Sequence, residues 1–174
     1  MLTAFDTADT PDCQAHVIQA LKVMSHKTGL YGMLGGQSVD VENDGKEISR
    51  EMLDYIYEHK TSALIEASMM AGAVLGGADE EQTALIEKAA SAIGMAFQIQ
   101  DDILDVTSTS QELGKPVHSD EKNHKVTYVT LFGVEKASEQ VLQFSEQAQS
   151  ILENLSNKNK FLTALIMEMA SRRK

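Results

Sequence analysis

The sequence predicts an all-α fold, and three observations lead to this prediction. Apolar residues recur at three- and four-residue spacing along most of the chain, which is the period of helices that bury one face. No stretch alternates apolar and polar residues with the β-branched composition of a half-buried strand. The chain has only two prolines, 43% hydrophobic residues and 174 residues in all, enough to bury a core. We therefore expect a single helical domain, residues 1–174.

The first helices are marked by their ends. The sequence TPD at residues 10–12 combines a hydroxyl cap, a proline at the first helical position and an acid in the first turn. This helix is expected to run to Gly29. A further helix from about Leu30 leads to Gln37 and Asp40, which lie one turn apart.

A long helix is predicted to follow Ser49, whose hydroxyl is placed to cap it. Lys60 and Thr61 lie near its middle, and it is expected to end at Gly76. Its second half, residues 63–76, is apolar nearly all round. We therefore expect this half to be a central, buried helix.

The next helix begins at Asp79, which has a glutamine three residues later, as in a capping box. It is expected to run to the sequence FQIQDDILD at residues 97–105. At about 100° per residue, Asp101 and Asp105 lie one turn apart on one face with Asp102 beside them. A mainly apolar helix thus ends in clustered negative charge.

Clustered carboxylates repel one another unless cations, protons or water offset the cost. Oxygen ligands favour Mg²⁺, which needs one or two carboxylates from a protein and takes further ligands from substrate phosphates. The cluster therefore indicates a substrate that carries phosphate. The three aspartates alone are equally compatible with a solvated helix end, but the apolar residues around them favour a cleft.

The last part of the chain contains a polar stretch and further helices. Residues 106–125 hold glycine, proline, serine and charges without helical periodicity, which predicts a long loop beside the charged site. Residues 125–132 are expected to form a short helix. Two amphipathic helices, residues 134–155 and 161–169, complete the bundle.

Composition excludes several classes of function. The net charge of -11 argues against a nucleic-acid partner, because phosphate backbones are bound by basic surfaces. The single Cys13 cannot form an internal disulfide, which fits a cytoplasmic location. No secretory signal is visible, and the longest nearly apolar run, residues 67–78, is too short to span a membrane.

Several linked motifs occur along the chain: GQSVD at residues 36–40, Lys60-Thr61, FQIQDDILD at residues 97–105, and LGKP at residues 113–116 followed by Asp120 and Lys125. In order and spacing they resemble the trans-polyprenyl diphosphate synthases, the group of farnesyl and geranylgeranyl diphosphate synthases. The resemblance extends from Leu2 to Lys174. It implies part of an isoprenoid-synthase helical bundle, a prenyltransferase of isoprenoid biosynthesis, and a homodimer.

The resemblance also implies a reaction and a role for each motif. An allylic diphosphate held by Mg²⁺ ionises, and isopentenyl diphosphate attacks the resulting cation. Charge that develops on the leaving diphosphate is stabilised by fixed cations in a site that excludes water. The implied metal residues are Asp101 and Asp105, supported by Asp102, and the implied residues that clamp the diphosphate are Lys60, Lys115 and Lys125. Thr61 and Gln98 would hydrogen-bond the substrate, and Phe97 would line the isopentenyl pocket. Gln37 and Asp40 would orient the Lys60 side chain without contacting the substrate themselves. Lys60 and Asp101 are the expected catalytic residues.

The sequence also departs from the family pattern. The family's first aspartate-rich motif and the arginine pair that follows it are not found in these 174 residues, and His118 replaces a glycine common in relatives. We therefore expect a C-terminal portion of a polyprenyl synthase, inactive alone. The alternative is a non-catalytic helical subunit or interaction module of the same fold. A terpene cyclase is a third possibility, but it is not expected to keep Lys115 and Lys125 in this pattern.

Overall fold

The computed structural model describes residues 11–108, 125–155 and 159–172, and within these ranges the chain forms helices and no strand. The prediction of an all-α fold is confirmed. The helices are α2 (Pro11–Thr28), α3 (Met33–Glu42), α4 (Arg50–Ile56), the π-helix η1 (Tyr57–Ser62), α5 (Ala63–Leu75), α6 (Glu80–Thr107), α9 (Tyr128–Phe132), α10 (Val134–Glu153) and α11 (Lys160–Ser171).

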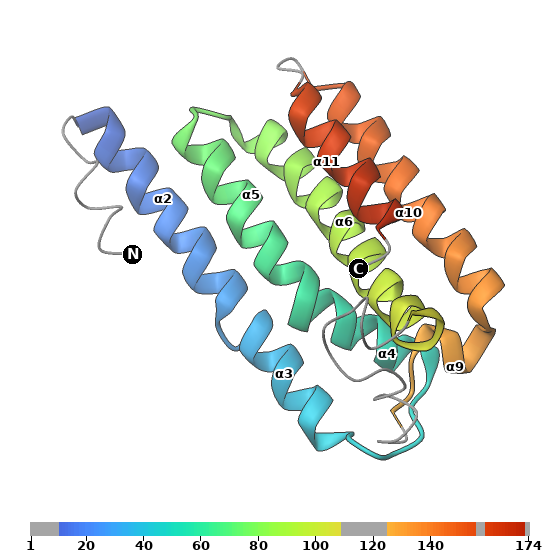
Figure 1. Ribbon diagram of the computed structural model, residues 1–174. Helices are drawn as coiled ribbons and strands as arrows, with labels where there is room; N and C mark the ends of the chain where they lie inside the picture. Colours follow the sequence, from blue (N-terminus) through green and yellow to red (C-terminus); the bar gives the residue numbers. More distant parts are fainter. Residues whose placement is uncertain (1–10, 109–124, 156–158, 173–174) are drawn as a thin grey trace.

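The long helices lie side by side in one layer (Figure 1). In this layer α5 packs between α2 and α6, and α6 packs between α5 and α10. Helix α3 continues the line of α2, while α4 and η1 lead into α5. Helix α11 lies against α10 and α6. The ends of α3, α4, α6 and α9 meet at the lower end of the layer in Figure 1.

Local sequence signals place several helix ends where they were predicted. The Ser49 side chain accepts a hydrogen bond from the backbone N–H of Met52 at 3.3 Å. Asp79 caps α6, and the reciprocal bond from the Gln82 side chain completes a capping box. Gly133 separates α9 from α10 with a φ of 81°, a conformation that glycine adopts without steric cost.

The predicted continuous helix from Ser49 to Gly76 is interrupted by η1 in its middle. This segment passes very close to the backbones of its neighbours. A Cβ atom on Gly36 of α3 would lie 2.7 Å from the carbonyl carbon of His59, and one on Gly94 of α6 would lie 2.5 Å from Cα of Ser62. Glycines on both sides therefore let α3 and α6 close on η1. This tertiary arrangement is not visible in local helix propensity.

One face of α5 is buried, but the prediction of a central, buried helix is wrong for the opposite face. Leu64 and Leu75 are 43% and 48% exposed. On the other side Glu66 is buried and forms an ion pair of 2.5 Å with Lys27 of α2. The same ammonium group also contacts Glu87 at 2.5 Å. A buried carboxylate is tolerated there because it has a charged partner.

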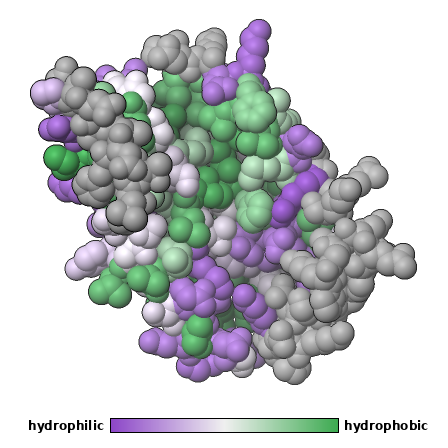
Figure 2. Space-filling view, turned by 60° about the vertical axis from the view of Figure 1, so that its left-hand side comes forward, coloured by the Kyte–Doolittle hydropathy of each residue, from purple (hydrophilic) through white to green (hydrophobic). Residues whose placement is uncertain are grey.

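The main core lies where α4, η1, α6, α9 and α10 meet. It consists of Leu53, Ile56, Tyr57, Met95, Ala96, Ile99, Ile103, Tyr128, Ala137 and Val141. Other large apolar side chains are exposed on several helices. The face drawn in Figure 2 shows one group of apolar residues bordered by hydrophilic ones. No helix in the described ranges combines the length and the hydrophobicity that crossing a membrane requires.

Candidate functional site

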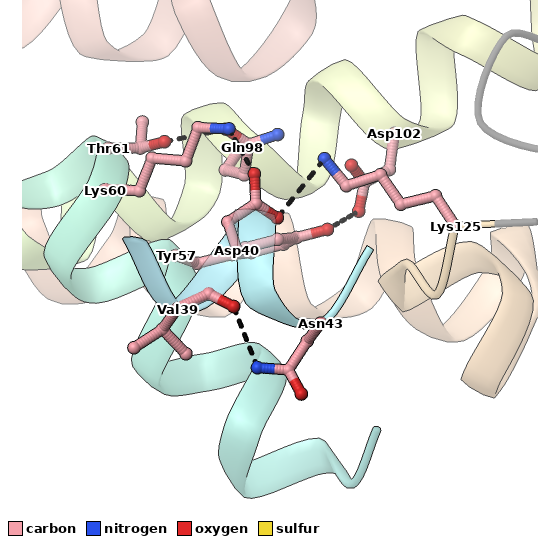
Figure 3. Close-up of polar contacts among 9 residues, drawn as sticks. All are labelled: Val39, Asp40, Asn43, Tyr57, Lys60, Thr61, Gln98, Asp102 and Lys125. Atoms are coloured by element: carbon pink, nitrogen blue, oxygen red, sulfur yellow. Dashed lines mark hydrogen bonds and ion pairs between the residues drawn. The ribbon is translucent and has the colours of Figure 1, made fainter. Parts of the chain in front are cut away.

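Two lysines converge on one aspartate where α3, η1 and the segment before α9 meet. The Lys60 ammonium pairs with Oδ2 of Asp40, and the Lys125 Nζ lies 3.7 Å from Oδ1 of the same carboxylate. Figure 3 shows the two lysines reaching Asp40 from different elements. We call Asp40, Lys60 and Lys125 the lysine–aspartate cluster. Its two positive charges exceed its single negative charge, so the cluster can attract an anion.

The backbone of η1 positions Lys60 and Thr61. Single π-helical turns occur often at functional sites because they change the direction of side chains within a helix. Gly36 lets α3 approach the Lys60 backbone, and Asp40 follows one turn later on the same helix. Gln37 is half-buried on this helix. The predicted proximity of Asp40 and Lys60 is therefore present, while the role of Asp40 in orienting Lys60 toward a ligand stays a prediction.

A second contact joins η1 to α6. The Thr61 hydroxyl donates to Oε1 of Gln98 at 2.8 Å (Figure 3). Gln98 stands one turn before the aspartates on α6. Two of the predicted substrate-binding residues, Thr61 and Gln98, thus contact each other. Their hydrogen bond links η1, which carries Lys60, to the end of α6 that carries the aspartates.

The three aspartates of α6 have different environments. The Asp101 side chain is 35% exposed and Oδ1 accepts a hydrogen bond from Nη2 of Arg172 at 3.2 Å. Asp105 is 3% exposed. Asp102 is also 3% exposed, and its Oδ2 accepts hydrogen bonds from the Tyr57 hydroxyl at 2.6 Å and from the Tyr128 backbone N–H at 3.2 Å. The three predicted carboxylates therefore differ in exposure and in hydrogen-bond partners.

The donor set fits a metal that takes few protein ligands. Among the described residues, no three His, Cys, Asp or Glu side chains converge into a complete metal site. Mg²⁺ binds through one or two carboxylates when an anion supplies the remaining oxygens. Asp101 has a partly exposed carboxylate and suits such a shared site. Asp105 is one turn further along the helix and can support it.

Sequence reasoning missed Arg172, which lies beyond α11 and contacts the aspartate-bearing helix. Its guanidinium carbon is 4.0 Å from the centre of the Phe97 ring, and Nη2 is 3.4 Å from the Phe97 carbonyl oxygen. The Gln100 side chain donates to the Arg172 carbonyl at 3.1 Å. One arginine therefore covers the ring of Phe97 and pairs with Asp101. An arginine in the basic sequence RRK at residues 172–174 gives no signal of such a contact.

Two buried tyrosines behind the site were also missed. The rings of Tyr57 and Tyr128 stack with their centroids 5.7 Å apart. The Tyr57 hydroxyl contacts Asp102, whereas the Tyr128 hydroxyl donates to Asp54 of α4. Burial, together with the Asp54 carboxylate, raises the pKa of Tyr128. A buried tyrosine is expected to find a hydrogen-bond partner, but sequence cannot identify that partner.

The remaining predicted residues cannot be placed. Lys115, His118 and Asp120 lie outside the described residues.

A crevice of about 10 Å³ beside Asp40 and Lys125 has room for roughly one water molecule. The described residues therefore offer an open, charged surface at the lysine–aspartate cluster and no enclosed cavity large enough for an organic ligand there.

Comparisons with known proteins concern the chain as a whole. A family model described as polyprenyl synthetase matches residues 3–168. Farnesyl diphosphate synthase of Geobacillus stearothermophilus is 39% identical over 137 residues, 79% of this chain and 46% of that protein. The heterodimeric geranylgeranyl pyrophosphate synthase large subunit 2 of Arabidopsis thaliana is 34% identical over 98% of this chain and 47% of that protein.

Solved structures show the same architecture. Geranyltransferase from Helicobacter pylori, complexed with magnesium and isoprenyl diphosphate, matches with a TM-score of 0.75 and 30% identity, over 89% of this chain and 51% of that chain. Geranylgeranyl pyrophosphate synthetase from Pyrococcus horikoshii has a TM-score of 0.79 at 24% identity, over 94% of this chain and 60% of that chain, which supports the fold alone. The chain spans about half the length of the curated relatives named here.

Proposed function

The chain belongs to the trans-polyprenyl diphosphate synthase family, and from this premise we propose that it carries the Mg²⁺ and diphosphate-binding part of a prenyltransferase site. The proposed reaction condenses isopentenyl diphosphate with an allylic diphosphate. The observation that carries this proposal is the convergence of Lys60 and Lys125 on Asp40. A diphosphate has more negative charge than one carboxylate, so it can compete with Asp40 for both ammonium groups.

Four side chains have proposed roles in holding the allylic substrate. Lys60 and Lys125 bind its diphosphate oxygens as donors with positive charge. Thr61 and Gln98, which already contact each other, hydrogen-bond the ester oxygen or direct an oxygen dipole toward the allylic cation. Lys115 is proposed to complete the clamp on the grounds of the motif alone. Because these donors come from different elements, they can fix the direction in which the leaving diphosphate departs.

The proposed metal residues are Asp101 and Asp105, with Asp102 behind them. When bound, Mg²⁺ supplies positive charge that stabilises the diphosphate as a leaving group. The similar geranyltransferase from Helicobacter pylori was solved with magnesium and isoprenyl diphosphate, which supports this choice of metal and ligand. Phe97 is proposed to line the isopentenyl pocket, and the Arg172 guanidinium lies over one face of its ring.

A non-catalytic helical subunit is the second candidate, and the exposed apolar side chains favour it. The Arabidopsis relative is named as the large subunit of a heterodimeric enzyme. Such a module would bind another protein through exposed apolar side chains, among them Leu64 and Leu75. A homodimer stays a prediction. So does the cytoplasmic location, since similar proteins include one named as chloroplastic.

The experiment that separates the two candidates is a calorimetric titration with inorganic pyrophosphate in the presence of Mg²⁺. We expect Lys60→Gln and Lys125→Gln each to weaken binding by at least about tenfold, the size expected for a lost charged hydrogen bond. Lys136→Gln, which removes an exposed lysine on α10, is the matched control and should bind as the wild type does. Equal affinities in all four proteins would contradict the proposed function.

A further inference from the structure

The Asp102 carboxylate connects three parts of the proposed site. We call the Tyr57 hydroxyl, the Asp102 carboxylate and the Tyr128 N–H the Asp102 junction. Both hydrogen bonds end on the same oxygen, Oδ2, and the three residues are all buried. Figure 3 shows the Tyr57 side chain reaching Asp102 from beneath Asp40.

Each member of the junction belongs to a different element and stands close in sequence to a charged residue of the site. The pairs are Tyr57 with Lys60 on η1, Asp102 with Asp101 on α6, and Tyr128 at the start of α9 with Lys125 just before it. Tyr57 and Asp102 are 45 residues apart in sequence, and Asp102 and Tyr128 are 26 apart. The junction therefore determines how three separate cationic and acidic groups lie relative to one another.

We propose that Asp102 is a positioning residue rather than a metal ligand, and that Tyr57 is the donor that holds it in place. The inference rests on the proposed function of the site. Turning Oδ2 toward a metal ion would take the acceptor from the Tyr57 hydroxyl and the Tyr128 N–H in a buried environment. Buried donors without acceptors are costly, so Oδ2 stays with them. In this proposal the metal is held by Asp101 and Asp105, and Oδ1 of Asp102 does not coordinate it.

The chain offers a matched control for the Tyr57 hydroxyl. Tyr128 is stacked on Tyr57, is equally buried, and also donates its hydroxyl to an aspartate. That aspartate is Asp54 of α4, which is not part of the junction. Tyr57→Phe and Tyr128→Phe therefore remove the same group from the same aromatic pair, while both leave the Tyr128 backbone N–H in place.

The test is calorimetry with inorganic pyrophosphate and Mg²⁺, at a temperature where circular dichroism shows each variant fully folded. Tyr57→Phe should weaken affinity by about tenfold or more, the usual effect of losing a residue that orients a ligand-binding group. Tyr128→Phe should stay within about twofold of the wild type, since its hydroxyl contacts nothing in the site. Unchanged affinity in Tyr57→Phe, or an equal loss in both variants, would overturn the inference. A wild-type protein that does not bind would refute the proposed function, and this inference with it.

A second pair of variants keeps the test decisive if Tyr57→Phe does not fold. In Asp102→Asn an amide oxygen can occupy the place of Oδ2 and accept the same two hydrogen bonds. A positioning role predicts affinity within about threefold of the wild type, while Asp101→Asn loses about tenfold or more. Equal losses in the two asparagine variants would show that Asp102 acts as a ligand and would overturn the inference.

Discussion

Replacing Gly36 with alanine tests how the fold places Asp40 against Lys60. The added methyl group would lie 2.7 Å from the carbonyl carbon and Cβ of His59, and closer still to the backbone nitrogen of Lys60. Ordinary contact begins at 3.4 Å, and the Lys60 nitrogen would lie 2.3 Å away, so α3 must withdraw from η1 by about an ångström. Since two of the atoms are backbone, η1 cannot yield by rotating a side chain.

Overpacking of this kind costs about 1–3 kcal/mol of stability, somewhat offset by the higher helix propensity of alanine. For a chain of this length, each kcal/mol lowers the Tm by roughly 2–4 °C. We therefore expect Gly36→Ala to melt several degrees below the wild type. Its affinity for pyrophosphate with Mg²⁺ should also fall, because the withdrawal carries Asp40 away from Lys60.

The control is Gly72→Ala, the same substitution at a helical glycine with no atom within 4 Å of the added methyl group. Alanine there should stabilise the protein by about 0.5–1 kcal/mol through helix propensity alone. Urea unfolding monitored by circular dichroism gives both free energies, and calorimetry gives both affinities. If Gly36→Ala matched Gly72→Ala in stability and affinity, the close approach of α3 and η1 would not be what positions the cluster.

Two further predictions concern the other charged contacts. Arg172→Gln should raise the affinity for Mg²⁺ with pyrophosphate by up to about fivefold, because it removes the cation that pairs with Asp101. If calorimetry showed a lower affinity instead, Arg172 would be part of the binding site. The second follows from the raised pKa of Tyr128, whose ordinary value is 10.0. The neutral hydroxyl is favoured in the folded state, so its stabilisation is complete below pH 10 and is lost as pH rises toward the folded-state value, by up to about 1.4 kcal/mol per pH unit. Urea unfolding should show this alkaline loss in the wild type and less of it in Tyr128→Phe; equal pH profiles would contradict it.

Local chemistry explains what could be predicted from the sequence. Ser49 and Asp79 mark helix starts because a capping side chain bonds to a backbone N–H only three residues away. The linked motifs likewise made Lys60, Asp40 and Lys125 candidates for one site. Their meeting in space follows from the packing of α3, η1 and the segment before α9, which the order of motifs alone does not describe.

The parts that could not be predicted depend on distant residues. The π-helical turn η1 lies where Gly36 and Gly94 allow backbones from two other helices to close on it. The contact of Arg172 with Asp101 spans 71 positions, and neither residue carries a local sign of the other. For Asp102, helical periodicity correctly placed it beside the other two aspartates but could not show that its carboxylate accepts bonds from two buried elements.

The dependence of allylic diphosphate binding on Mg²⁺ tests the central claim most directly. The affinity of the protein for geranyl diphosphate is measured by calorimetry in Mg²⁺ and again in EDTA, with Asp101→Asn as the paired variant. We expect removal of Mg²⁺ to weaken binding to the wild type by at least about tenfold, because metal and diphosphate stabilise each other in one site. Asp101→Asn should bind equally weakly in both conditions. Equal affinity of the wild-type protein in Mg²⁺ and in EDTA would contradict the claim that these residues form a metal-dependent diphosphate site.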